Sequence, residues 1–200
     1  GFFKRLKTAG RILYSLEAKD KIEKLITEEK PDIAHLHNIC HQISPSIIDT
    51  LKARGIPVVM TLHDYKLTCP VYTLLRGGKP CEECGGGKFY KAIVNKCTKG
   101  SAFKSSINTI EMYLHHKFLH IYEKVDEFIS PSRFLLGKTR EMGFKGSINY
   151  LPNFIPVEDF TPSYTHDENS IVYVGRLSEE KGLSTLVESV REIDVKLKII

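Results

Sequence analysis

One stretch of the chain carries no charge and ends abruptly in polar side chains. Residues 56–65 read Ile-Pro-Val-Val-Met-Thr-Leu-His-Asp-Tyr, so that Val58 to Leu62 are all apolar or β-branched. A short run of this kind is typical of a strand buried on both faces in the middle of a parallel sheet. Ligands of open α/β sheets bind outside the carboxyl ends of the strands, which makes His63 and Asp64 candidate catalytic residues. The alternative is that these two side chains only hydrogen-bond a loop into place.

The segment before this strand completes a βαβ unit. Residues 32–37 predict a short strand, and Ser44-Pro45 predicts the start of a helix over 45–54, with Ser44 capping its free amides. Strand 32–37, helix 45–54 and strand 57–62 therefore form one unit, whose crossover should be right-handed.

Helices and strands continue to alternate as far as residue 151. Hydrophobic periodicity predicts helices over 11–29 and over roughly 102–122. The second of these helices has five apolar residues on or near one face: Phe103, Ile107, Ile110, Leu114 and Phe118. Residues 125–129 predict a strand, Ser132 can cap a helix that runs to about Met142, and residues 147–151 predict a further parallel strand.

The composition changes after residue 154. Residues 155–169 contain prolines and acids without a helical or strand period, which predicts a linker. The β-then-α alternation restarts over 170–200. The predicted fold class is α/β, with a Rossmann-like parallel sheet domain over 1–154 followed by the first βαβ of a second Rossmann-like domain over 170–200.

A long cysteine-containing insertion, residues 66–100, interrupts the first domain. It contains Cys69, Cys81, Cys84 and Cys97, and Cys81-Glu82-Glu83-Cys84 has the spacing of a zinc knuckle. A structural zinc site of four thiolates would hold this loop in place. The alternative is four reduced thiols, with Cys69 packed and the others mobile.

The turn at residues 175–182 is a second candidate site. Gly175 lets the backbone approach a ligand closely, while Arg176 and Lys181 flank the entry to a helix whose first amides favour an anion. A diphosphate would fit such a turn. The alternative is an ordinary strand-to-helix turn with two surface cations.

The order of these pieces is more specific than any one of them. The strand ending in His63-Asp64, the run Leu151-Pro152-Asn153-Phe154-Ile155-Pro156, and the later Gly175-Arg176 and Glu180-Lys181-Gly182 resemble the family-four glycosyltransferases of GT-B architecture. The resemblance implies two Rossmann-like domains, of which residues 1–154 would be the acceptor half and 170–200 the start of the donor half. It implies transfer of a sugar from a nucleotide-sugar donor to a glycan or lipid-linked acceptor, with retention of configuration and with no cofactor required.

The resemblance also assigns roles to individual residues. Arg176 and Lys181 match the pair that holds the donor diphosphate, and Gly175 matches the glycine at the tip of that turn. His63 matches the histidine near the transferred sugar, with Asp64 as a partner for it or for the acceptor. The physical logic agrees, because fixed cations stabilise the charge that develops on a leaving diphosphate.

Two departures from the family pattern lead to expectations about the rest of the enzyme. The family begins with a strand and a glycine-rich loop that are not found before residue 11, and its pair of donor-binding glutamates should lie beyond Ile200. The 200-residue chain is therefore expected to be truncated at both ends and inactive alone. Two rival functions remain open: a non-catalytic zinc-bearing binding module, and a GT-B-like sugar-nucleotide epimerase.

Charge and cysteine usage suggest the surroundings in which the protein works. The net charge is +5, and cations cluster in residues 4–11 and 88–104. Each cluster alone is most simply a solvated basic face. The functional alternative is attraction to phosphate or peripheral contact with an anionic membrane, for which Phe2, Phe3 and Leu6 among the first cations could form an interfacial helix. No nucleic-acid partner is expected, because few aromatic residues interleave with the lysines. Five cysteines with one close pair indicate a reducing compartment, so the expected location is the cytoplasm or the inner face of the plasma membrane.

Overall fold

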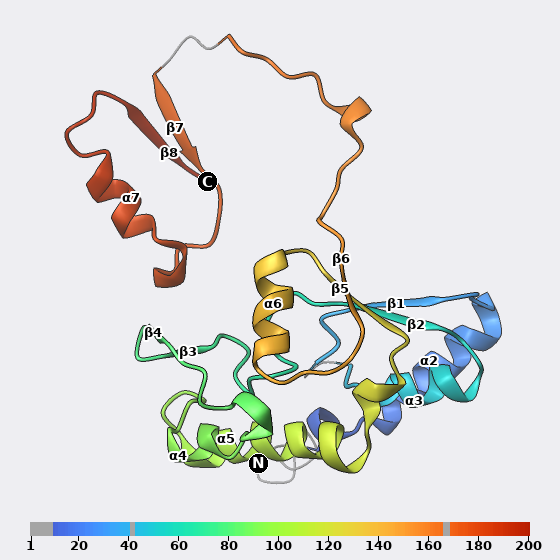
Figure 1. The fold of residues 1–200 in the computed structure, drawn as a ribbon. Helices are drawn as coiled ribbons and strands as arrows, with labels where there is room; N and C mark the ends of the chain where they lie inside the picture. The colour runs from blue at the N-terminus through green and yellow to red at the C-terminus, as the bar shows by residue number, and fades with distance from the viewer. Residues whose placement is uncertain (1–9, 41–42, 166–168) are drawn as a thin grey trace. The chain divides into compact units, whose positions relative to one another are not determined.

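The computed structural model describes residues 10–40, 43–165 and 169–200 (Figure 1). The chain divides into two compact units, Gly1–Asn153 and Phe154–Ile200. The predicted interfacial segment at Phe2, Phe3 and Leu6 lies outside the described residues.

The first unit is built on a parallel sheet of four strands in the order β1-β2-β5-β6. These strands span Ala34–His37, Val58–Thr61, Glu127–Ser130 and Ile148–Tyr150. The predicted α/β class with a Rossmann-like parallel sheet is thus confirmed. The charge-free strand is β2, and it lies between β1 and β5 as expected of an interior strand.

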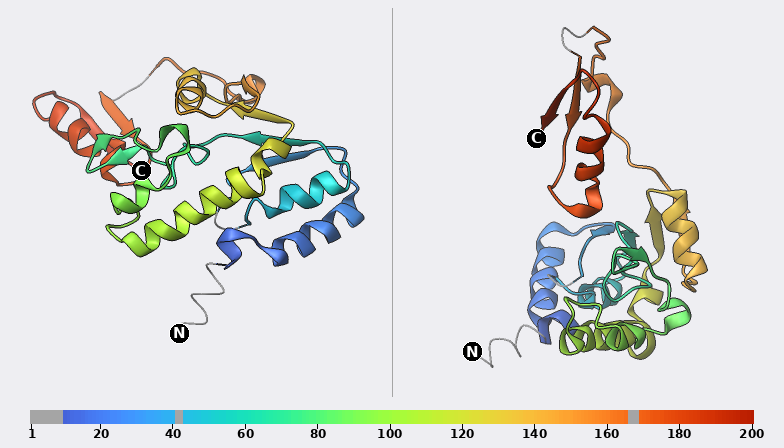
Figure 2. Two further views of the ribbon diagram at one scale, coloured as in Figure 1. Left: turned by 60° about the horizontal axis from the view of Figure 1, so that its bottom comes forward. Right: turned by 90° about the vertical axis from the view of Figure 1, so that its left-hand side faces the viewer.

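Helices connect and cover these strands. The main helices of the unit are α2, Leu16–Glu29, α3, Ser46–Ala53, α5, Ala102–Tyr113, and α6, Arg133–Glu141. Figures 1 and 2 show α2, α3 and α5 as one layer on the same side of β1 and β2. One face of the sheet is consequently buried: Leu36, Val58, Met60, Phe128 and Ile148 are at most 8% exposed. The opposite face is covered less, since Val59 is half-buried and His35 and His37 are exposed.

Several helix ends differ from the prediction. The helix expected over 11–29 is two segments, because Ser15 leaves helical geometry and caps α2 by accepting a hydrogen bond from the Ala18 amide. Ser44 does not cap α3 in the expected way: Pro45 holds that position, and the Ser44 hydroxyl accepts only from the Ser46 amide. The predicted cap of α6 at Ser132 is present, with the Leu135 amide as donor at 3.1 Å.

The helix expected over 102–122 is divided, and its apolar side faces away from the core. After α5 the chain forms a π-helix, Leu114–Phe118, and a 3₁₀ turn, Ile121–Lys124. The side of α5 that packs inward carries Ser105, Thr109, Glu111 and Met112, all buried. The five apolar residues identified from the sequence lie on its outer side instead, where Phe103, Ile110 and Phe118 are more than half exposed.

The insertion has structure of its own. It contains a two-stranded antiparallel hairpin, β3 at Leu75–Arg76 and β4 at Lys79–Pro80, then a 3₁₀ turn, Gly85–Gly87, and a short helix α4, Lys91–Val94. Cys84, Phe89 and Ala92 pack against Met112 of α5. The loop is thus ordered largely by packing on the helix that follows it.

The second unit contains one βαβ unit, as predicted. Strands β7, Ser170–Tyr173, and β8, Lys196–Ile199, pair in parallel, and α7, Leu183–Ser189, connects them. The 3₁₀ turn Val157–Asp159 precedes them along the chain.

A buried ion pair joins the turn after β2 to α5. The Lys66 ammonium donates to the Glu111 carboxylate at 2.7 Å, and the two side chains are 7% and 0% exposed. His115 Nδ1 lies 3.9 Å from the same carboxylate. Burial lowers the His115 pKa, and its Nε2 donates to the Leu13 carbonyl at 2.7 Å.

Removing one member of this pair should destabilise the first unit strongly. Lys66→Met or Glu111→Leu leaves the other charge buried alone, which we expect to cost about 3–5 kcal/mol in urea unfolding. The double variant should recover most of that loss. Additive losses in the double variant would contradict this account. Variants of the exposed Glu17–Lys21 pair are the control and should barely shift the midpoint.

Candidate functional site

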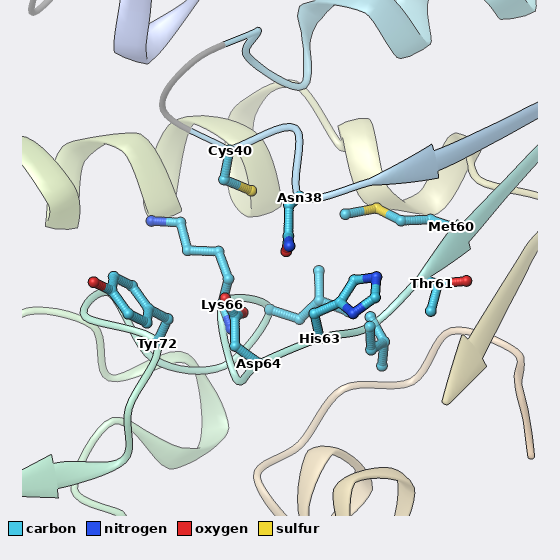
Figure 3. Close-up of a pocket in the computed structure, with 10 residues that line it drawn as sticks. Asn38, Cys40, Met60, Thr61, His63, Asp64, Lys66 and Tyr72 are labelled. Atoms are coloured by element: carbon cyan, nitrogen blue, oxygen red, sulfur yellow. The ribbon is translucent and has the colours of Figure 1, made fainter. Parts of the chain in front are cut away.

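The carboxyl ends of β1 and β2 open into a cavity of about 340 Å³ (Figure 3). It lies where the two neighbouring parallel strands end, as the position of ligands in such sheets predicts. Its walls are formed by Asn38, Cys40, Met60, Thr61, Leu62, His63, Asp64, Lys66, Leu67 and Tyr72. The two predicted residues, His63 and Asp64, thus lie together in its wall.

His63 is held by a second histidine. Its Nε2 lies 2.8 Å from Nδ1 of His37, the last residue of β1. In such a contact one nitrogen donates and the other accepts, so this hydrogen bond couples the tautomers of the two rings. The contact leaves Nδ1 of His63 as the ring nitrogen available to another group.

The contact between His37 and His63 is supported from the strand side. The ring of His35 lies 4.2 Å from that of His37, and His35 Nε2 lies 2.8 Å from the hydroxyl of buried Thr61. Burial lowers the pKa of His35, and the neighbouring imidazoles of His37 and His63 lower it further. A chain of contacts therefore leads from the buried strand to the exposed His63.

Asp64 has a structural role as well as a place in the cavity. Its carboxylate accepts a hydrogen bond from the Lys66 amide at 2.8 Å, which closes a tight turn directly after β2. The side chain is half-buried and borders the cavity. Both interpretations of Asp64 therefore fit its position, since one carboxylate oxygen orders the turn at the cavity wall.

Two wall residues adopt left-handed backbone conformations. Asn38 has φ 46° and Tyr72 has φ 57°. A bulky residue such as tyrosine rarely adopts this region, and conformations of this kind cost about 1–3 kcal/mol and cluster at functional sites. No sequence pattern points to Tyr72, whereas Asn38 could have been found because it directly follows the neighbouring strand.

Cys40 also lines the cavity. Its Sγ lies 3.7 Å from the Tyr122 hydroxyl. Burial raises the pKa of the Cys40 thiol to about 11, so it stays protonated at neutral pH and is no nucleophile.

The second unit presents Gly175, Arg176 and Lys181 on one strand-to-helix turn. The Tyr173 hydroxyl donates to the Arg176 carbonyl at 2.9 Å, which folds the turn back over its strand. A Cβ added at Gly175 would lie 3.1 Å from that hydroxyl, so glycine suits this close approach. Lys181 ends a 3₁₀ turn that stops at Gly182, whose φ is 68°.

The insertion brings its four cysteines into electrostatic range of one another. Burial raises the pKa of the Cys84 thiol to about 12, with further contributions from Cys69, Cys97 and Cys81. All four are free thiols, and Cys69 is buried as expected. Within residues 10–40, 43–165 and 169–200, no three His, Cys, Asp or Glu side chains are grouped so that they could hold a metal ion. The zinc site stays a prediction.

Comparison with known proteins identifies the family. The model of Glycosyltransferase Family 4 matches residues 3–159, more than half of the chain, and the protein belongs to that family. Neither the curated proteins nor the solved structures contain a match.

The contact between the two histidines predicts a measurable tautomer bias. In ¹⁵N spectra of labelled histidine, His63 should favour one neutral tautomer in the native protein. His37→Ala should return that ratio to the value of an unrestrained histidine, and His37→Asn, whose amide can replace Nδ1, should preserve it. His120→Asn is the control, because that ring pairs with Glu123. An unchanged ratio in His37→Ala would refute the contact.

The zinc prediction is tested by metal analysis. The zinc hypothesis requires protein purified without chelator to contain about one equivalent of zinc, which Cys81→Ser with Cys84→Ser should abolish. Cys40→Ser is the matched control and should keep the metal. Less than about a tenth of an equivalent in the unaltered protein would end the zinc hypothesis.

Proposed function

We propose that this protein is a retaining glycosyltransferase that moves a sugar from a nucleotide-sugar to a glycan or lipid-linked acceptor in envelope polysaccharide synthesis. Family membership supports the general activity. The finer proposal depends chiefly on one observation, the cavity at the ends of β1 and β2 with His63 and Asp64 in its wall.

The chemistry of the cavity suits a sugar. It is bordered by an amide, a carboxylate, a phenol and an imidazole, contributed by Asn38, Asp64, Tyr72 and His63. Such groups can donate to and accept from sugar hydroxyls, while Leu62 and Leu67 supply apolar contact. In this proposal His63 orients the transferred sugar through Nδ1.

The second unit would contribute the donor diphosphate site. In retaining transfer the bond from the anomeric carbon to the diphosphate breaks, and the leaving group gains negative charge. Arg176 and Lys181 on the turn after β7 would offset that charge, and Gly175 would let the backbone come close. The epimerase alternative shares this fold but would use different cleft carboxylates.

The proposal predicts a specific pattern of catalytic losses. In the full-length enzyme, Arg176→Ala or Lys181→Ala should lower kcat by about 10²–10³-fold, because a fixed cation facing the leaving group is lost. His63→Ala should also lower kcat. Arg191→Ala, an exposed arginine elsewhere in the second unit, is the control and should change little.

The assay measures nucleoside diphosphate release from a panel of nucleotide-sugars, with the anomeric configuration of the product read by NMR. Inversion of configuration, or full activity of Arg176→Ala, would overturn the mechanism. An interconverted sugar-nucleotide without transfer would instead favour the epimerase.

A further inference from the structure

The outer side of α5 and of the π-helix that follows forms an exposed apolar stripe. It consists of Phe103, Ile107, Ile110, Leu114 and Phe118, which we call the outer stripe. Phe103 and Phe118 are each 76% exposed and Ile110 is 53% exposed. An amphipathic helix normally turns its apolar side to the core, so this orientation requires an explanation.

The surroundings of the outer stripe are cationic. Residues 84–122 contain six lysines and a single acid, Glu111, whose side chain is fully buried against Lys66. Lys104 and Lys117 are exposed on the same helical segment as the stripe. Three further exposed lysines, Lys88, Lys96 and Lys99, flank α4, which packs beside α5 in all views (Figures 1 and 2). Residues 84–122 therefore present apolar side chains and positive charge without an exposed carboxylate, and the acids at their two ends, Glu83 and Glu123, pair with Arg76 and His120.

We propose that the outer stripe docks on an anionic lipid surface. A helix with aromatic and aliphatic residues on one side and lysines at its flanks can lie in the plane of the membrane, with its apolar side chains at the boundary between headgroups and acyl chains. The surrounding lysines then face anionic headgroups, each strengthening binding about fivefold. Among the described residues, the structure contains no helix with the length and hydropathy of a membrane span.

Other occupants fit these residues less well. A second copy bound through the same stripe would form a two-fold contact and bring the lysines of the two copies together. A nucleic acid would engage the lysines, but it would leave the aliphatic side chains of Ile110 and Leu114 without apolar contact. The combination of the stripe and its charge favours lipid.

The test is vesicle co-sedimentation of the chain as it stands, with phosphatidylcholine alone and mixed with phosphatidylglycerol. We expect binding to the anionic vesicles that weakens as salt is raised, because the lysine contribution is screened. Phe103→Ser with Phe118→Ser should weaken it about tenfold or more for each phenylalanine removed. Lys104→Gln with Lys117→Gln should weaken it about fivefold for each lysine.

Matched controls lie elsewhere on the first unit. Phe134→Ser replaces a phenylalanine that is 69% exposed on α6, and Lys24→Gln replaces an exposed lysine of α2. Both should bind like the unaltered chain, and urea unfolding checks that every variant is folded.

Three results would overturn the proposal. These are equal binding to neutral and anionic vesicles, equal binding by the stripe variants, and a dimer in sedimentation experiments that the stripe variants dissociate. The last would assign the stripe to a second copy. None of these results depends on sugar transfer, so this proposal and the catalytic one can fail separately.

Discussion

The arrangement of the first unit depends on the ion pair between Lys66 and Glu111. Two charges with almost no exposure to water are tolerated only when they face each other, since either one alone would remain unsolvated. The pair joins residues that are 45 positions apart. It therefore requires the chain between them to fold back, so that α5 packs beneath the turn that carries His63 and Asp64. The insertion occupies that interval, and its ordering follows from the same constraint.

The sheet could be predicted because its determinants are local. The short uncharged run at Val58 to Leu62 favours an interior strand through its own residues, and Ser132 favours a helix start through its own hydroxyl. The side of α5 that packs against the core could not be predicted, because a helical period of 3.6 residues shows only that one side of the helix is more apolar than the other. The choice of the inward side depends on Lys66, a partner outside the helix. The rule that apolar residues face inward therefore failed at α5.

The candidate site also has a part that could be predicted from the sequence and a part that could not. His63 and Asp64 were predictable from their position at the end of a strand. The role of His37 was not, because its contact with His63 requires the pairing of β1 with β2, in which His37 lies opposite Thr61. Tyr72 reaches the cavity only because the insertion turns back, and its left-handed backbone leaves no trace in a pattern of apolar residues. The residue at which a strand ends can thus be predicted from the sequence, whereas contacts between side chains of different strands become known only from the three-dimensional structure.

The buried pair also shapes the surface of the molecule. Glu111 is the only acid between residues 84 and 122, and Lys66 draws it into the interior. Lysines are consequently the charged side chains that remain on the outer side of the same segment, beside the outer stripe. If Glu111 were exposed, its carboxylate would oppose an anionic surface and weaken the attraction of the nearby lysines. One interior contact thus both places α5 against the turn that carries His63 and Asp64 and keeps the Glu111 carboxylate away from the outer side of that segment. Stability of the core and the charge of the outer face are, in this protein, consequences of a single interaction.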